Sequence, residues 1–296
     1  MKKLRLLNFT PLLIAVPSTL IGVLAMYTNK VPVAIYGQNF FYLLICVIIS
    51  CLVLLRKSKL KNNVVANSVT IIVTVILLFL TFISSGIEGV HRWVSVGPIK
   101  FYVSVIVLPI MIICLWKLSQ TKDWWFSATI TIVVSILLTI QPDASMLTAF
   151  AIPMIMLLWN KINNNIFRSC IIVLLSALII ISWLFLDGLP PVSYVENIVS
   201  LVANMGIIWL SLGIISLVIL PLPFIFFPPK KYKLLSVSIG IYFIIILIST
   251  IFGNFPVPLM GYGVSPIIGY FISITWFSKS KCKDRKSTRL NSSHRL

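Results

Sequence analysis

Seven ionisable side chains that could do chemistry lie in short segments between long apolar runs. Four are carboxylates and three are cationic or titratable, namely Glu88, His91, Arg92, Lys100, Asp143, Asp187 and Glu196. A carboxylate can act as a general base, and cationic donors can stabilise negative charge that develops during a reaction. Four of the seven share one stretch with Trp93, EGVHRWVSVGPIK at 88–100, although only 10% of the chain is charged. These residue types suit a polar site.

The elements that must position these residues are membrane-spanning helices. The chain is 59% hydrophobic, with a mean hydropathy of +1.07, whereas soluble domains are about 45–50% apolar. A helix that crosses a bilayer needs about 20 mostly apolar residues. Uncharged runs follow one another along the chain at 6–29, 31–55, 62–87, 101–116, 124–142, 144–160, 169–186, 197–229 and 234–278.

The last of these runs is long enough for two spans. It contains GNFPVPLMGYGVSP, whose glycines and prolines interrupt a helix. The pattern therefore predicts an all-α, polytopic integral membrane protein with about ten transmembrane helices. We expect one ten-helix transmembrane domain over 1–283, beginning with an uncleaved first helix after MKKLR. Residues 284–294, DRKSTRLNSSH, match a translated sequencing adapter, so we expect 284–296 to be non-native. Without them the formal charge falls from +18 to +15, because they hold four basic residues and one acidic residue.

The basic residues predict the orientation, since Lys and Arg concentrate in cytoplasmic loops. With the N-terminus inside, the inner segments hold 17 basic residues and the outer loops hold three, Lys30, Arg92 and Lys100. The basic residues of the inner segments lie at the ends of helices, which argues against a nucleic-acid-binding surface. The five cysteines show no disulfide framework and no metal-ligand spacing.

The acidic residues follow the opposite distribution. Of the five within 1–283, only Asp123 is predicted to be inside. Acidic residues contribute little to topology. A polar site that faces outward would explain why the other four lie in outer loops.

Four segments along the chain carry a family resemblance. They are LIGVLAMYT at 20–28, GVHRWVSVGPIKFYVS at 89–104, QPDASMLTA at 141–149 and PVPLMGYGVS at 256–265. In this order, and at the outer ends of spans, they resemble motifs of the SEDS family of bacterial membrane proteins, the FtsW and RodA type. The matches in the second segment include Arg92, Trp93, Gly97, Pro98 and Ser104.

The resemblance implies a function. SEDS proteins have ten transmembrane helices and lie in the bacterial plasma membrane, where they polymerise peptidoglycan glycan strands from lipid II at the outer face. They serve cell shape, division or sporulation, usually with a single-pass transpeptidase partner. The resemblance implies no certain cofactor; a divalent cation, Mg²⁺ or Mn²⁺, is the one to consider. This chain is thus expected to be a peptidoglycan glycosyltransferase with its N-terminus in the cytoplasm.

The chain also departs from the family pattern. Val105 and Leu108 replace a Glu and a Lys, and Ala144 and Ser145 replace Leu-Gly. Val195 stands where the family has its essential aspartate, and Glu196 follows it. Either Glu196 replaces that aspartate or the site is inactive. Two alternatives stay open: an inactive SEDS-like partner in wall assembly, and a transporter of a lipid-linked precursor. A transporter is expected to carry ionisable residues within its spans, which this chain almost lacks.

The predicted site has Glu196 as its catalytic base. The predicted substrate-binding residues are Glu88, His91, Arg92, Trp93, Lys100, Asp143, Asp187, Tyr262 and Ser265. Several of these have a second interpretation. Arg92 and Trp93 are also suited to interfacial anchoring, His91 to a solvated loop, Asp143 to a helix N-terminus, Asp187 to a turn, and Glu196 to the first turn of a helix.

Overall fold

The computed structural model describes residues 9–56, 63–84, 86–97 and 99–293, with side chains described up to 284. Predicted features that fall outside these residues are MKKLR, Pro98, much of the basic segment after Arg56, and the last three residues of the adapter-like tail. The chain divides into two compact units. Unit 1 comprises Met1–Leu60, Ser193–Gly240 and Pro256–Leu296, and unit 2 comprises Lys61–Val192 and Ile241–Phe255.

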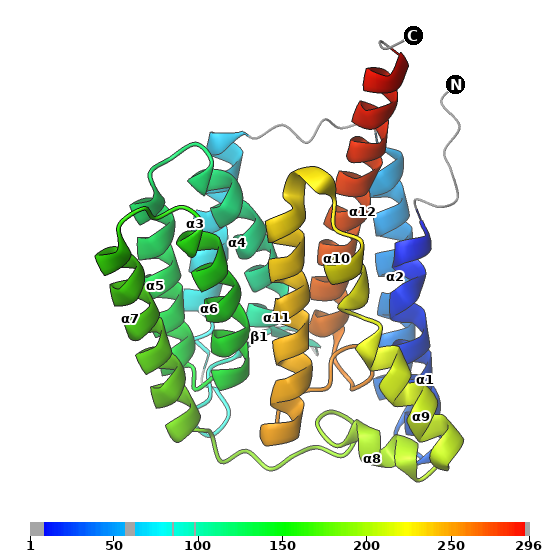
Figure 1. Cartoon of the computed structure of the whole chain (residues 1–296). Helices are drawn as coiled ribbons and strands as arrows, with labels where there is room; N and C mark the ends of the chain where they lie inside the picture. The colour runs from blue at the N-terminus through cyan, green and yellow to red at the C-terminus, as the bar shows by residue number, and fades with distance from the viewer. Residues whose placement is uncertain (1–8, 57–62, 85, 98, 294–296) are drawn as a thin grey trace. The chain divides into compact units, whose positions relative to one another are not determined.

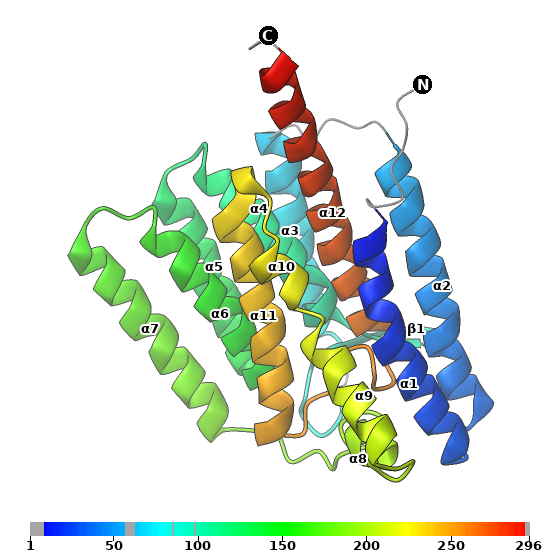
Figure 2. The same ribbon diagram turned by 45° about the vertical axis from the view of Figure 1, so that its right-hand side comes forward.

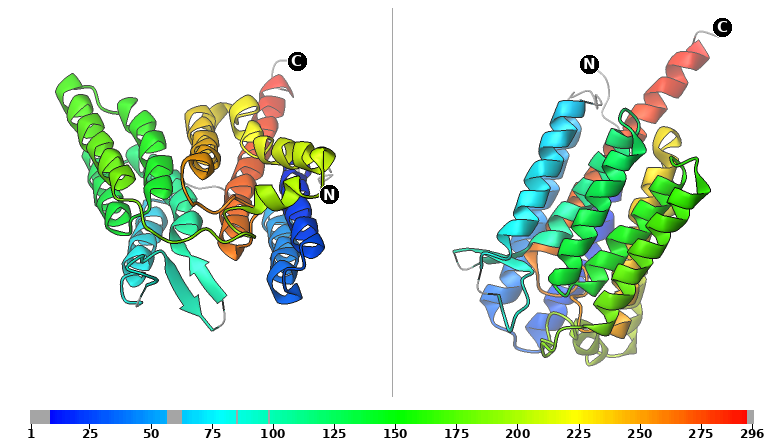
Figure 3. Two further views of the ribbon diagram at one scale, coloured as in Figure 1. Left: turned by 90° about the horizontal axis from the view of Figure 1, so that it is seen from below. Right: turned by 90° about the vertical axis from the view of Figure 1, so that its left-hand side faces the viewer.

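Unit 2 is built from helices joined by short loops (Figure 1). They are α3 Val64–Leu80, α4 Val103–Ser119, α5 Trp124–Ile140, α6 Ala144–Trp159, α7 Asn165–Leu184 and the second part of α11, Lys233–Phe252. Asparagine side chains begin two of the helices, because Asn63 accepts from Ala66 N at the start of α3 and Asn164 accepts from Ile166 N at the start of α7. A two-stranded antiparallel hairpin, β1 Trp93–Val96 and β2 Ile99–Tyr102, connects α3 to α4 (Figure 3).

Unit 1 holds the remaining elements, in which α1, α2 and α12 pack against one another (Figure 2). They are η2 Thr10–Ile14, α1 Ala15–Thr28, α2 Val33–Leu55, α8 Ile198–Ala203, α9 Ile207–Val218, α10 Leu222–Phe226, η3 Lys230–Tyr232, the first part of α11, and α12 Val264–Ser293. A close approach of backbones explains Gly22 on α1, where a Cβ would lie 2.0 Å from the carbonyl oxygen of Met260.

The helices have the composition of membrane spans. Thr10–Thr28, Val33–Leu55, Asn165–Leu184 and Lys230–Phe252 are long and apolar enough to cross a bilayer. Helices α3, α4 and α5 have 17 residues each and α6 has 16, near the lower end of the spanning range. On α7 large apolar side chains such as Val173 and Leu184 are exposed, while Ser182 is buried. The chain is therefore a multi-pass membrane protein, as predicted.

The eighth predicted span differs from a single helix. The sequence predicts one span over 197–229, whereas the structure divides it into α8, α9 and α10. Gly206 adopts a φ of +110° between α8 and α9, a conformation that favours glycine, and Pro221 caps the start of α10. The break predicted within 234–278 is confirmed, since α11 ends at Phe252 and α12 begins at Val264.

Candidate functional site

The hairpin of unit 2 places Arg92 at the base of its two strands. Trp93 pairs with Tyr102 and Val96 with Ile99, and Val103 N donates to the Arg92 carbonyl at 3.2 Å. This pairing fixes the backbone of Arg92 beside the first residue of α4. Its side chain points inward and is only 3% exposed, so its charge must be neutralised by the protein.

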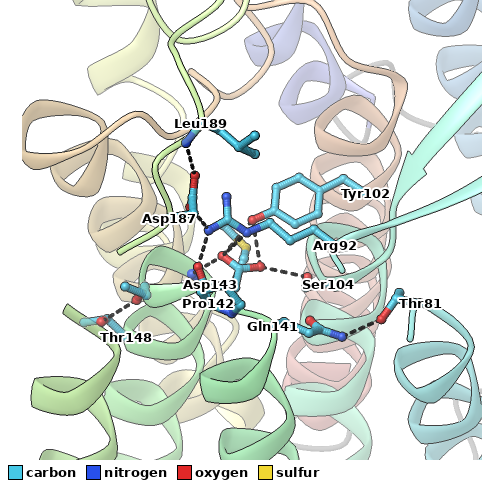
Figure 4. A network of polar contacts seen from close by, with 12 residues as sticks. Thr81, Arg92, Tyr102, Ser104, Gln141, Pro142, Asp143, Thr148, Asp187 and Leu189 are labelled. Atoms are coloured by element: carbon cyan, nitrogen blue, oxygen red, sulfur yellow. Dashed lines mark hydrogen bonds and ion pairs between the residues drawn. The ribbon is translucent and has the colours of Figure 1, made fainter. Parts of the chain in front are cut away.

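Two carboxylates surround this guanidinium (Figure 4). Arg92 Nη2 donates to Asp187 Oδ2 and to the Pro142 carbonyl, and Arg92 Nε lies 4.0 Å from Asp143 Oδ1. The side chain of Asp143 is fully buried and that of Asp187 is 9% exposed. Phe255 completes the surroundings, with its ring centre 5.8 Å from Arg92 Cζ. Three of the predicted site residues thus form one buried cluster.

Asp143 receives hydrogen bonds from several directions. Tyr102 OH donates to the carboxylate at 2.7 Å and Ser104 Oγ donates at 3.1 Å. Met146 N donates at 3.3 Å, which makes Asp143 the N-cap of α6. The interpretation of Asp143 as a helix N-terminus is therefore confirmed, and it coexists with the ion pair.

The electrostatics of the cluster are dominated by burial. Burial raises the pKa of Asp143, while the Arg92 guanidinium and the hydrogen bonds from Tyr102, Met146 and Ser104 oppose that rise. For Arg92, burial acts to lower the pKa, but Asp143, Tyr102 and Asp187 together raise it. Burial and the neighbouring Asp143 also raise the pKa of Tyr102, which keeps its hydroxyl protonated as a donor. Arg92 thus stays charged and is held by the protein's own carboxylates.

The other predicted residues of unit 2 are more accessible. Glu88 and Lys100 are exposed, and Trp93 and His91 are half-buried. The His91 ring stacks on Phe82 with 5.7 Å between centres, and its Nδ1 lies 3.1 Å from the Ser84 carbonyl oxygen. Trp93 contacts Tyr102 at 6.0 Å. His91 is thus packed against the protein, while Glu88 and Lys100 extend into the surroundings.

The predicted residues of unit 1 lie on two loops that are joined by their backbones. Tyr262 N donates to the Tyr194 carbonyl at 2.8 Å, and Val257 N donates to the Val195 carbonyl at 3.3 Å. The aromatic rings of Tyr194 and Tyr262 meet edge to face at 6.1 Å. Glu196 follows Val195 directly and is half-buried. The hydrogen bonds of Tyr194 and Val195 therefore hold the backbone next to the Glu196 carboxylate in place.

Asn39 on α2 holds the second of these loops in place. Its Nδ2 donates to the Gly261 carbonyl at 3.0 Å, and its Oδ1 accepts from Gly263 N at 3.1 Å. Nearby, Tyr262 OH donates to Gln38 Oε1 at 2.9 Å. Asn39 is fully buried, and Ser265 at the start of α12 is 2% exposed. The loop before α12 is thus shaped by polar contacts within unit 1.

Comparison with known proteins identifies the fold. No protein-family model matches the chain, and no curated protein matches it significantly. Among solved structures, the rod shape-determining protein RodA of Thermus thermophilus matches with a TM-score of 0.65 at 15% identity, covering 92% of this chain and 95% of that one. An aspartate-to-alanine mutant of the same protein matches equally well, covering 96% of its own chain. The chain has the RodA fold.

A third match extends this result. A chain from a peptidoglycan synthase complex that coordinates polymerization and crosslinking has a TM-score of 0.64 and 15% identity, with 93% of this chain and 97% of that chain covered. These matches confirm the all-α, polytopic membrane fold that the apolar runs predicted.

Within this RodA fold, residues that the sequence reasoning did not assign to the site also contribute. Tyr102 and Ser104 hold Asp143, and Asn39 and Gln38 hold the loop of Gly261 and Tyr262. The sequence contained a sign of the role of Asn39, because an amide is unusual within the long apolar run 31–55. It contained no such sign for Tyr102, because a Tyr at the start of a span also fits an interfacial position.

The residues of this RodA fold give little support to a bound metal ion. Among the described residues, no three His, Cys, Asp or Glu side chains lie close enough together to hold one. The two carboxylates that do converge, Asp143 and Asp187, are directed at Arg92. These two carboxylates are therefore already paired with a cation of the protein.

Proposed function

We propose that this protein is a divergent SEDS-type peptidoglycan glycosyltransferase that polymerises lipid II at the outer face of the bacterial plasma membrane. The observation that carries the proposal is the RodA fold over more than nine-tenths of the chain, combined with four motif-like segments in family order. The complex matched above also supports a transpeptidase partner for this chain. The process served is one of cell shape, division or sporulation.

The orientation proposed from the charge count has support from unit 2. Lys117 lies in the last turn of α4 and Lys122 follows that helix, at the end of α4 opposite to the Arg92 cluster. Lys161 precedes α7 and Arg168 lies in its first turn, at that same opposite end. This end thus holds four basic residues and Asp123, whereas the other end holds Glu88, Asp143 and Asp187 with Arg92 and Lys100. By the positive-inside rule the acidic end is outside and the N-terminus is cytoplasmic.

Glu196 is the proposed general base. Polymerisation requires a sugar hydroxyl to lose its proton as its oxygen attacks an anomeric carbon, while the lipid pyrophosphate leaves. A half-buried carboxylate on a fixed segment is suited to accept this proton. Tyr262, on the loop that fixes this segment, and Ser265, at the start of α12, are the proposed substrate contacts of unit 1.

The unit 2 residues divide into two proposed roles. Lys100, together with Glu88, His91 and Trp93, is accessible enough to contact substrate, and the Lys100 ammonium is suited to stabilise the pyrophosphate charge. Arg92 is buried and held by Asp143 and Asp187. We therefore assign these three to positioning the hairpin that carries Lys100.

The test is a polymerisation assay. Purified protein is mixed with lipid II, with and without a cognate transpeptidase, and the products are separated on a gel. We expect a ladder of glycan strands, and no ladder under either condition would contradict the polymerase proposal.

One observation favours the alternative of an inactive partner: Val195 and Val105 replace acidic residues of the family pattern. The variant Val195→Asp separates the two proposals. If the natural chain gives no ladder but Val195→Asp does, the protein is an inactive SEDS-like partner in wall assembly. A ladder from the natural chain would instead exclude this alternative.

A further inference from the structure

Unit 1 contains a cavity whose lining includes neither Glu196 nor the loop before α12. The cavity has a volume of about 390 Å³, within the range of about 300–1,000 Å³ typical of ligand pockets. Its walls come from η2, from α10 with Ile219 before it and Phe227 after it, and from α12 between Phe277 and Cys282. These elements lie at the lysine-bearing end of unit 1, where α12 carries Lys279, Lys281 and Lys283.

The wall of this cavity is apolar along most of its length. Ile14, Ile219, Leu222 and Phe227 all line it. Because the surrounding helices span a bilayer, the molecules with access to an apolar cavity between them are lipids. A hydrocarbon chain is the occupant that this wall suits.

Two polar features stand beside the apolar wall. Lys281 lines the cavity, and its Nζ lies 4.9 Å from the centre of the Phe227 ring and 5.5 Å from that of Phe277. These rings hold the ammonium group at the cavity. Ser278 also lines the cavity, and its buried hydroxyl makes no hydrogen bond with a described residue. Buried hydroxyls normally have a partner, so a ligand oxygen would satisfy this one.

The charge around the cavity selects among lipids. Lys230, Lys231 and Lys233 lie on η3 and the start of α11, and η3 packs against α12, where the rings of Tyr232 and Trp276 meet at 6.1 Å. Six lysines therefore gather here. The backbone N of Lys231 donates to Asp284 Oδ2, and Asp284 lies in the tail that we expect to be non-native. Basic pockets between helices of this kind favour anionic head groups.

We propose that this cavity binds one acyl chain of an anionic phospholipid, with Lys281 contacting the phosphate. The site is separate from the proposed polymerase residues, so its failure would leave the polymerase proposal intact. The lipid would hold η2, α10 and α12 together at this end of unit 1.

The test compares two lipids with identical acyl chains. Purified full-length protein in detergent is titrated with phosphatidylglycerol or with phosphatidylcholine, and retained lipid is counted by native mass spectrometry. We expect one phosphatidylglycerol to be retained about fivefold more tightly than phosphatidylcholine, since one lysine near a head group has about this effect. Equal retention of the two lipids would overturn the proposal.

Three variants locate the site. Lys281→Gln should reduce phosphatidylglycerol retention to the phosphatidylcholine level, whereas Lys30→Gln, which removes the same charge beyond the other end of α1, should retain the preference. Leu222→Phe narrows the cavity and should weaken the binding of both lipids. Size-exclusion chromatography first checks that this variant elutes as a single folded species. The proposal is overturned if Lys281→Gln keeps the preference or if folded Leu222→Phe binds both lipids unchanged.

Discussion

The carboxylates of the two units are used in different ways. In unit 2, Asp143 and Asp187 are buried around Arg92, and each also accepts at least one hydrogen bond from the protein. In unit 1, Glu196 is half-buried on a loop whose position is set by backbone hydrogen bonds of its neighbours, Tyr194 and Val195. Charges that are buried and paired maintain a local structure. A half-buried carboxylate on a segment of fixed backbone is suited to accept a proton from a substrate.

The comparison predicts that substitutions in unit 2 mainly change stability and that substitutions in unit 1 mainly change activity. The largest stability effect is expected for Arg92→Leu, because it leaves two buried carboxylates without their cation. Breaking a buried pair in this way costs about 3–5 kcal/mol. The free energy of unfolding, from denaturant titration in micelles, measures it.

Lys100→Met is the matched control for Arg92→Leu, since it removes a cation from the same hairpin at an exposed position. Its unfolding free energy should change by no more than about 0.5 kcal/mol. If the two variants are equally stable, the buried cluster does not maintain the hairpin.

The next effect concerns the backbone contact that fixes the Glu196 segment. In Gly261→Ala the new Cβ would lie 2.4 Å from the Val195 carbonyl oxygen and 3.0 Å from that of Val257. The two loops must separate, so we expect glycan-ladder intensity to fall at least about tenfold, because small displacements of catalytic groups are costly.

Gly37→Ala on α2 serves as the control for that substitution, because a Cβ there meets nothing within 4 Å. Its ladder should match that of the natural chain. A Gly261→Ala variant with full activity would show that the segment's path does not matter for the reaction.

A smaller effect is expected for Asn39→Ala, which removes both polar contacts to the loop of Gly261 and Gly263. Leaving these groups unsatisfied costs about 1–3 kcal/mol. Thermal unfolding followed by tryptophan fluorescence should show a lower midpoint, whereas an unchanged midpoint would mean that the loop is held by other contacts.

Effects of similar size to that of Asn39→Ala are expected for the hydroxyls that hold Asp143. Tyr102→Phe and Ser104→Ala each remove one type of donor at 2.7 and 3.1 Å. A hydrogen bond to a charged group contributes about 1.5–3 kcal/mol, and we expect Tyr102→Phe to cost more because its contacts are shorter. The reverse order in the same denaturant titration would contradict this assignment.

The sequence predicted the helical membrane fold because apolar runs and interrupting Gly and Pro residues are local signals. It also predicted that Asp143 would begin a helix. It did not predict the division of 197–229 into three helices, since neither Gly206 nor Pro221 alone excludes a continuous span. Nor did it predict that Asp187, 95 residues from Arg92, would pair with it, because spacing along a chain does not specify contact between distant loops.

The orientation of Arg92 on the hairpin could not be predicted from the sequence either. The Gly97-Pro98 pair was visible in the sequence, but the strand pairing that directs Arg92 inward depends on contact between β1 and β2. A basic residue beside Trp93 suits an interfacial anchor equally well. Only the positions of Asp143 and Asp187 decide between the two.

The most direct test of the central claim is the Glu196→Gln variant in the lipid II polymerisation assay. Removal of a general base typically lowers a rate by about 10²–10⁴-fold, so we expect loss of the glycan ladder with an unchanged unfolding midpoint. Asp123→Asn, which alters an exposed carboxylate outside the proposed site, should leave the ladder largely intact. A natural chain and a Glu196→Gln variant with equally strong ladders would contradict the assignment of Glu196 as the base.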